Sequence, residues 1–137
     1  APSRGLGDVY KDRVAGDRGA LRAMHIFDDS RRAAEQVAAL RNNDFDHFLK
    51  LVNDAGDSSW KYLQNVIPSG SREHQSMAFT IALCKKLLNG RGAVRVHGGG
   101  FAGTALAFVP DGEFNKFREG VERVLGAGCC HKLSIAK

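Results

Sequence analysis

The chain has 137 residues, which suits one domain with a single hydrophobic core. Hydrophobic residues make up 43% and charged residues 26%, as in ordinary globular proteins, and no apolar run of about 18 residues would span a membrane. The net charge of +5 is compatible with an anionic partner. Acidic residues interrupt the basic ones and no RNA-binding aromatic motif occurs, so we expect no nucleic-acid partner.

The three cysteines are Cys84, Cys129 and Cys130. An odd number of cysteines, two of them adjacent in the sequence, is a poor disulfide framework. A reducing, cytoplasmic location is therefore expected. Residues 1–16 show no clear period and are interpreted as a linker or lead-in, which leaves residues 17–137 as the domain. From Asp17, a candidate N-cap, apolar residues share one helical face until residues 42–43, as one long helix or two.

A second helix is predicted to begin after Asp44, a suitable N-cap, and to be interrupted by Gly56. Its spacing predicts a buried stripe of Phe45, Phe48, Leu49 and Val52. Trp60 and Tyr62, like the two phenylalanines, are assigned to the core. A third helix is predicted over residues 71–88 and is stopped by Asn89-Gly90. Its buried face is expected to consist of Met77, Ile81, Cys84 and Leu88.

The period then changes to that of strands. Residues 93–96 form one predicted strand, and the apolar run 104–109 forms a second that is expected to be buried on both faces. A fourth helix starts at Pro110-Asp111, and a last strand covers residues 129–135. The inward residues of that helix are expected to be Phe114, Phe117, Val121, Val124 and Leu125. This order predicts an α+β sandwich, with helices covering one face of a small, mostly antiparallel sheet.

The segment between the first two strands is rich in glycine: Gly98, Gly99, Gly100 and Gly103 lie within six positions. It joins strand to strand, whereas a dinucleotide fingerprint leads into a helix, and it lacks the lysine of a P-loop. Two interpretations stay open. The segment is a tight hairpin with a bulge, or its bare backbone approaches a ligand closely, with Phe101 packed as an anchor.

Residues 95–104, Arg-Val-His-Gly-Gly-Gly-Phe-Ala-Gly-Thr, resemble the third signature motif of the GHMP small-molecule kinases, most closely that of the galactokinase family. Two earlier segments resemble the same family in the same order: residues 21–25 followed by Asp29, and residues 51–54 with Ser58. There are departures. Residues 93–97 differ from the family's Gly-Ala-Arg-Met-Thr, Thr104 stands where Cys is frequent, and residues 59–75 differ from the usual sequence.

The resemblance implies a ferredoxin-like α+β domain, the C-terminal domain of such a kinase. The whole enzyme would transfer the γ-phosphoryl group of ATP, with Mg²⁺, to the C1 hydroxyl of galactose or a related sugar. In this family the N-terminal domain supplies the ATP phosphate loop, the catalytic Asp and Arg, and most sugar contacts. None of these motifs is found in this sequence. We therefore expect no catalytic residue here, an inactive chain when isolated, and a cut boundary at Ala1.

The resemblance also implies that one segment lines the cleft beside the phosphate loop and the substrate: His97, Gly98, Gly99, Gly100, Phe101, Ala102 and Gly103. Asn53, Ser58 and Arg95 are further candidates to face that cleft, although Asn53 and Ser58 also suit helix caps. His25 is expected to be a buried structural histidine. No metal site is expected at Cys129-Cys130-His131, because neighbouring strand residues point to opposite faces. The alternative function is a non-catalytic, galactokinase-like sensing or interaction domain.

Overall fold

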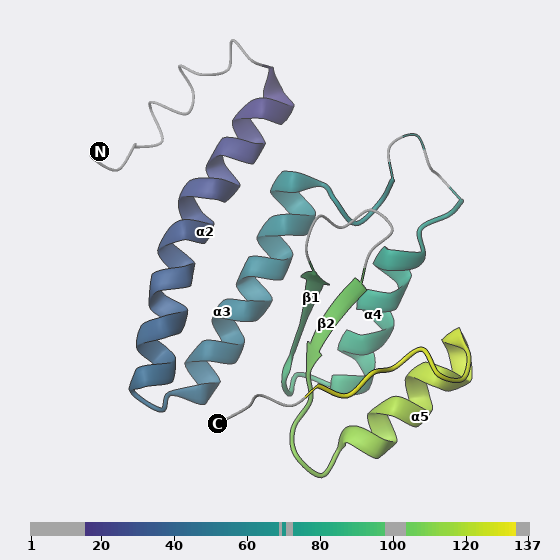
Figure 1. Cartoon of the computed structure of the whole chain (residues 1–137). Coiled ribbons are helices and arrows are strands. Elements are labelled where there is room, and N and C mark those ends of the chain that lie inside the picture. The colour runs from purple at the N-terminus through teal and green to yellow at the C-terminus, as the bar shows by residue number, and fades with distance from the viewer. Residues whose placement is uncertain (1–15, 69, 71–72, 98–103, 134–137) are drawn as a thin grey trace.

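The computed structural model describes residues 16–68, 70, 73–97 and 104–133, so residues 1–15 of the lead-in segment lie outside them. The elements follow in the order α2 (Asp17–Arg41), α3 (Phe45–Ser58), the π-helix η2 (Ser59–Leu63), α4 (Ser76–Leu88), β1 (Ala93–His97), β2 (Thr104–Phe108) and α5 (Phe114–Leu125) (Figure 1). The predicted α+β class with an antiparallel sheet is confirmed. No helix in the described part of the chain is long and apolar enough to cross a membrane.

The sheet is a hairpin of β1 and β2, in register from Ala93 opposite Phe108 to His97 opposite Thr104. Since side chains alternate along a strand, Val94 and Val96 point to one face, where α4 and α5 cover them. The core on this face consists of Val66, Met77, Ala78, Ile81, Cys84, Leu88, Val94, Val96, Phe117 and Val121. The four residues predicted for the buried face of the third helix are all among them.

Helix α3 packs against β1 on the side where the Arg95 side chain points, and α2 packs on α3 (Figure 1). The Phe48 ring of α3 meets the Phe108 ring of β2 edge to face, with centroids 5.6 Å apart. Of the two alternatives for the first helix, the structure has one continuous helix. Its N-cap is Gly16 rather than Asp17, and its C-cap is Asn42.

The predicted cap at Asp44 is confirmed: its Oδ1 accepts the backbone N–H of His47 at 3.2 Å. The predicted interruption at Gly56 is wrong, because α3 continues through Gly56 to Ser58 and passes into η2. The glycine serves packing instead, since a Cβ at this position would lie 2.8 Å from Arg95 Cβ. A helix can keep a glycine when a neighbouring backbone must come close.

The last predicted strand is not formed by the described residues, and two helices begin later than predicted. Residues 129–133 form no strand, and the backbone N–H of Gly128 instead donates to the Glu122 carboxylate at 3.2 Å. Helix α5 begins at Phe114 rather than at residue 110, because Gly112 has a φ of 85°, which is not helical. Helix α4 begins at Ser76, and residues 73–75 before it are not helical.

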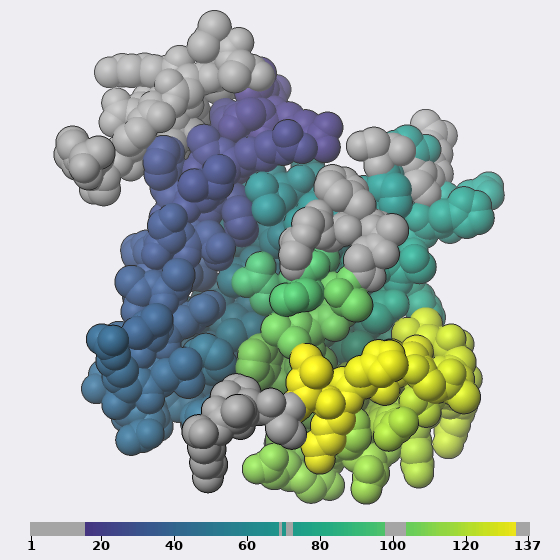
Figure 2. All heavy atoms as spheres, viewed as in Figure 1, coloured from purple at the N-terminus to yellow at the C-terminus, as the bar shows by residue number. Residues whose placement is uncertain are grey.

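Several apolar residues are more exposed than predicted. Phe45 is 60% exposed and Val124 is 52% exposed, so both lie on the surface, and Trp60 and Leu125 are also exposed. Strand β2 is half-buried along most of its length rather than buried on both faces. In the space-filling view, atoms of the two strands are visible between α2 and α3 on one side and the segment after α5 on the other (Figure 2). The second sheet face is therefore only partly covered.

Candidate functional site

The sequence analysis predicted a cleft at the end of the hairpin where β1 leads into the glycine-rich segment. His97 closes β1 and pairs with Thr104, the first residue of β2, and both are exposed. The six residues that join them, Gly98, Gly99, Gly100, Phe101, Ala102 and Gly103, lie outside the described residues. Their assignment to a cleft stays a prediction, as does the alternative of a tight hairpin. The structure fixes the two strand ends from which this loop starts and returns.

Arg95 lies two residues before the strand end, half-buried, with its side chain on the α3 side of the sheet. Its Nε donates to the carbonyl oxygen of Val96 at 3.0 Å, which leaves the terminal guanidinium nitrogens for other partners. Within the described residues, no carboxylate lies within ion-pairing distance of Arg95. A guanidinium without a carboxylate partner is suited to bind an anionic group such as a phosphate.

Ser58 is buried at the end of α3, where its hydroxyl is hydrogen bonded to Nδ1 of His25 in α2 at 2.8 Å. The other ring nitrogen of His25 lies 3.8 Å from the Asp29 carboxylate. Burial lowers the pKa of His25, and the charge of Asp29 partly opposes this. His25 is thus a buried histidine with partners, as expected, and Ser58 joins α2 to α3. A role for Ser58 in a cleft stays a prediction.

Asn53 binds the outer edge of β1 through both atoms of its amide group. Its Nδ2 donates to the carbonyl oxygen of Gly92 at 3.2 Å, and its Oδ1 accepts the backbone N–H of Val94 at 3.1 Å. These are the bonds that a neighbouring strand would otherwise make. The contact at Gly56, one turn further along α3, holds the same strand. Asn53 therefore positions β1, and with it the strand end at His97.

The π-helix η2 and the segment after it were not predicted from the sequence. Gln64 ends η2 with a left-handed backbone, φ 56°, and the buried hydroxyl of Ser59 donates to Asn65 Oδ1 at 2.9 Å. Single π turns occur often at functional sites. The only available signal was the polar run that follows Gly56, which gives no helical period. η2 contacts α2, and in Figure 1 it lies in the same half of the molecule as the first turns of α2.

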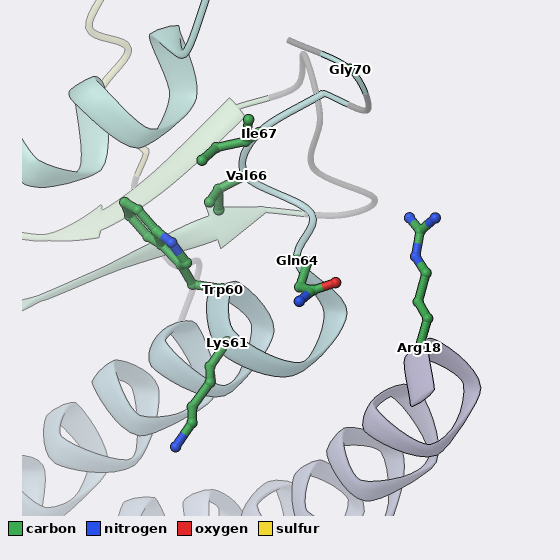
Figure 3. A pocket seen from close by; sticks show the side chains of 7 residues that line it. All are labelled: Arg18, Trp60, Lys61, Gln64, Val66, Ile67 and Gly70. Atoms are coloured by element: carbon green, nitrogen blue, oxygen red, sulfur yellow. The ribbon is translucent and has the colours of Figure 1, made fainter. Parts of the chain in front are cut away.

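A shallow hollow of about 580 Å³ opens beside η2. Figure 3 shows Arg18 of α2 reaching toward the segment after η2, the Trp60 indole near Val66 and Ile67, and Lys61 pointing away. The described residues that line the hollow include two cations and no carboxylate. They are Arg18, Trp60, Lys61, Gln64, Val66, Ile67 and Gly70. Elsewhere in the described residues, no group of three or more His, Cys, Asp or Glu side chains is arranged to hold a metal ion.

Comparison with known proteins identifies what the chain resembles. It is 30% identical over 97 residues to a galactokinase of Actinobacillus pleuropneumoniae, covering 71% of this chain and 23% of that protein. A galactokinase of Haemophilus influenzae is 27% identical over 100 residues, with coverage of 73% and 24%. One from Glaesserella parasuis is 26% identical over 98 residues, with coverage of 72% and 24%. No family model matches the chain.

These matches confirm the resemblance to galactokinases that the motifs indicated, and they are consistent with a C-terminal domain of such an enzyme. The chain spans about a quarter of the length of the curated relatives it matches. Galactokinase is the name of those relatives. Their shared segment accounts for most of this chain, whereas three quarters of each relative has no counterpart in it.

Proposed function

We propose that this chain is the C-terminal part of a galactokinase-like sugar kinase, in which the whole enzyme transfers the γ-phosphoryl group of ATP to the C1 hydroxyl of galactose. The observation that carries the proposal is the match of 97 to 100 residues to several galactokinases. The three motifs of the sequence support it, because they occur in the family's order. Phosphoryl transfer depends mainly on positioning and charge neutralisation, so a domain that only completes a cleft can still be essential.

ATP and Mg²⁺ have no recognisable binding motif in the sequence and no candidate metal cluster among the described residues. The sequence has no Pro-x-x-x-Gly-Leu phosphate loop, and the described residues offer no cluster of carboxylates for a metal ion. We therefore assign the binding of ATP and Mg²⁺ to a preceding N-terminal domain, which would be the main partner of this chain. No step of the reaction is assigned to a side chain of this chain acting as base or nucleophile.

The proposed role of this chain is to form one wall of the cleft at the end of the hairpin. The glycines between His97 and Thr104 leave room for a phosphate loop to approach. Arg95 adds a positive charge with no carboxylate partner among the described residues, and Asn53 and Gly56 hold its strand in place. In this proposal Arg95 offsets negative charge on the phosphates or on the transferred group.

A non-catalytic sensing or interaction domain is the second candidate, because a match to part of an enzyme does not include its catalytic residues. The residues encoded before Ala1 distinguish the two. A phosphate loop followed by the family's catalytic Asp supports the kinase, and a protein without them supports the sensing domain.

The test is an assay of ADP release with ATP, Mg²⁺ and a panel of sugars, run on the longer protein and on the 137-residue chain. We expect activity with galactose only in the longer protein. Arg95→Gln should lower kcat/KM about tenfold or more, since a hydrogen bond to a charged group contributes about 1.5–3 kcal/mol. The control is Arg91→Gln, which removes an exposed guanidinium that is paired with Glu113. Equal activity in the two variants would contradict the role of Arg95.

A further inference from the structure

One side of α2 carries an exposed apolar stripe. The helix packs on α3 and η2, and α3 lies between it and the sheet (Figure 1). Three of its buried residues recur every seven positions. They are His25, Arg32 and Ala39. The residues that directly follow them are exposed, and these are Ile26, Ala33 and Leu40. Because successive residues of a helix are turned by about 100°, the exposed three lie in one row beside the buried side.

The row is apolar along its whole length. Ile26 is 58% exposed and Leu40 is 44% exposed, and Val37, which lies one turn after Ala33 on the same side, is 47% exposed. Ser30 also borders the row, but its hydroxyl already donates to the carbonyl oxygen of Ile26 at 2.9 Å. Contiguous exposed apolar surface of this kind marks a site of interaction with another protein surface.

The two ends of the stripe carry opposite charge. The exposed charged residues at its start are Asp17, Arg18 and Arg22, and those after its end are Arg41, Asp44 and Asp46. Cations outnumber carboxylates at the start, and carboxylates outnumber cations at the end. A second copy that lies antiparallel on the stripe brings each end against its opposite, whereas a parallel copy opposes like charges. The surface is therefore complementary to itself in the antiparallel orientation.

We propose that a second copy of this chain docks on the stripe, in an antiparallel α2–α2 dimer whose twofold axis passes by Ala33. In this register Ile26 lies opposite Leu40 of the second copy, and Arg22 lies opposite its Asp44. Ala33 meets Ala33 of the second copy, and these small side chains allow the helices to approach closely. Each contact occurs twice, as a twofold interface requires. The dimer does not depend on the proposed kinase function.

The size of the stripe predicts a weak dimer. The whole of α2, about 38 Å long and about 10 Å wide, offers about 380 Å² to a second copy. This is below the surface of about 800 Å² that each partner buries in a standard interface. The apolar row supplies the affinity, and the exposed charges at its ends mainly select the orientation. We therefore expect a dimer that forms at micromolar or higher concentration and dissociates on dilution.

The test is sedimentation velocity of the 137-residue chain in a reducing buffer, over a range from about 1 to about 500 μM. We expect a shift from monomer to dimer with increasing concentration. Ala33→Glu places two like charges opposite each other at the axis and should raise the Kd of the dimer about tenfold or more. A chain that stays monomeric over the whole range would overturn the proposal.

Ala34→Glu is the matched control. Ala34 is also exposed, in the same helix, but it is turned about 100° away from Ala33 and lies off the stripe. Both changes introduce the same charge through a good helix former, so circular dichroism should show the parent fold in both variants. Ala34→Glu should change the Kd less than about twofold. Equal weakening by the two substitutions would overturn the proposed interface.

Arg22→Glu tests the orientation. In the antiparallel dimer the new carboxylate faces Asp44 of the second copy, so the dimer should weaken several-fold. In a parallel dimer position 22 would face itself, and one pair of like charges would only replace another. A dimer of unchanged or higher affinity would overturn the antiparallel arrangement. Growth beyond a dimer would overturn it as well, because a twofold interface closes on itself.

Discussion

Replacing Gly56 by alanine tests how closely α3 and β1 are packed. The added Cβ would lie 2.8 Å from Arg95 Cβ and 3.2 Å from both Arg95 Cα and Val94 O. These are backbone atoms or atoms next to the backbone, so relief requires the helix and the strand to move apart. Such overpacking costs about 1–3 kcal/mol. Alanine is favoured over glycine inside a helix by about 1 kcal/mol, so the two effects oppose each other.

Gly120 of α5 provides a matched control. A Cβ there would lie 2.9 Å from Cδ2 and 3.0 Å from Cδ1 of Leu87, the far end of a flexible side chain that is itself exposed. Leu87 can change rotamer, so Gly120→Ala should keep most of the gain of about 1 kcal/mol in helix propensity. Gly56→Ala should instead lose up to about 2 kcal/mol, the packing cost of about 1–3 kcal/mol less that gain. We expect the two variants to differ by about 2 kcal/mol.

The assay is equilibrium unfolding of the 137-residue chain in urea, with the m-value checked for constancy so that midpoint shifts report stability. Opposite signs for the two variants would support the packing argument. If Gly56→Ala stabilises the chain as much as Gly120→Ala does, the close contact with Arg95 does not exist as described. A loss of stability in both variants would show that Gly120→Ala is overpacked as well, so that the contact at Gly56 is not the distinguishing cause.

Three further predictions concern the supports of the site and its loop. Asn53→Ala should cost about 1–3 kcal/mol in urea unfolding because it leaves the buried N–H of Val94 unpaired, whereas Asp54→Ala should change stability by less than about 0.5 kcal/mol. Since the folded-state pKa of His25 lies below 6.5, the unfolded chain binds more protons, so stability should fall as pH drops below that value. A His25→Gln variant should show a shallower fall, and an identical pH profile would refute this. On the proposed kinase function, Gly99→Val in the longer protein should abolish most turnover, and normal activity would contradict a closely approached loop.

The fold was predictable where one local signal decides the structure. The apolar face of α4 and the side-chain cap at Asp44 depend on spacing and residue type alone, and both predictions are confirmed. Gly56 was predicted wrongly because its reason is a strand about 40 residues later in the chain, which no local pattern shows. The segment after Gly128 has the composition of a strand. The backbone N–H of Gly128, directly before it, is instead bonded to a helix side chain, Glu122, which a propensity cannot reveal.

The candidate site was predicted unevenly. His97 was placed between the predicted strand 93–96 and the glycines, and in the structure it is the last residue of β1. Ser58 and Asn53 were singled out by family resemblance, but their partners, His25 and the edge of β1, became visible only when α2, α3 and the sheet were brought together. Trp60 was assigned to the core as an aromatic residue, but it lies in the π-helix, which no local pattern predicted, and it is exposed.

The amide of Asn53 has a consequence for solubility. An outer strand of a sheet exposes unpaired N–H and C=O groups, to which another chain can add a strand and begin aggregation. At β1 two of these groups, the carbonyl of Gly92 and the N–H of Val94, are already occupied by one side chain. A second molecule would have to displace that amide before it could extend the sheet here. One asparagine on a helix thus protects the outer edge of β1 against intermolecular strand pairing, at the strand that leads to the glycine loop.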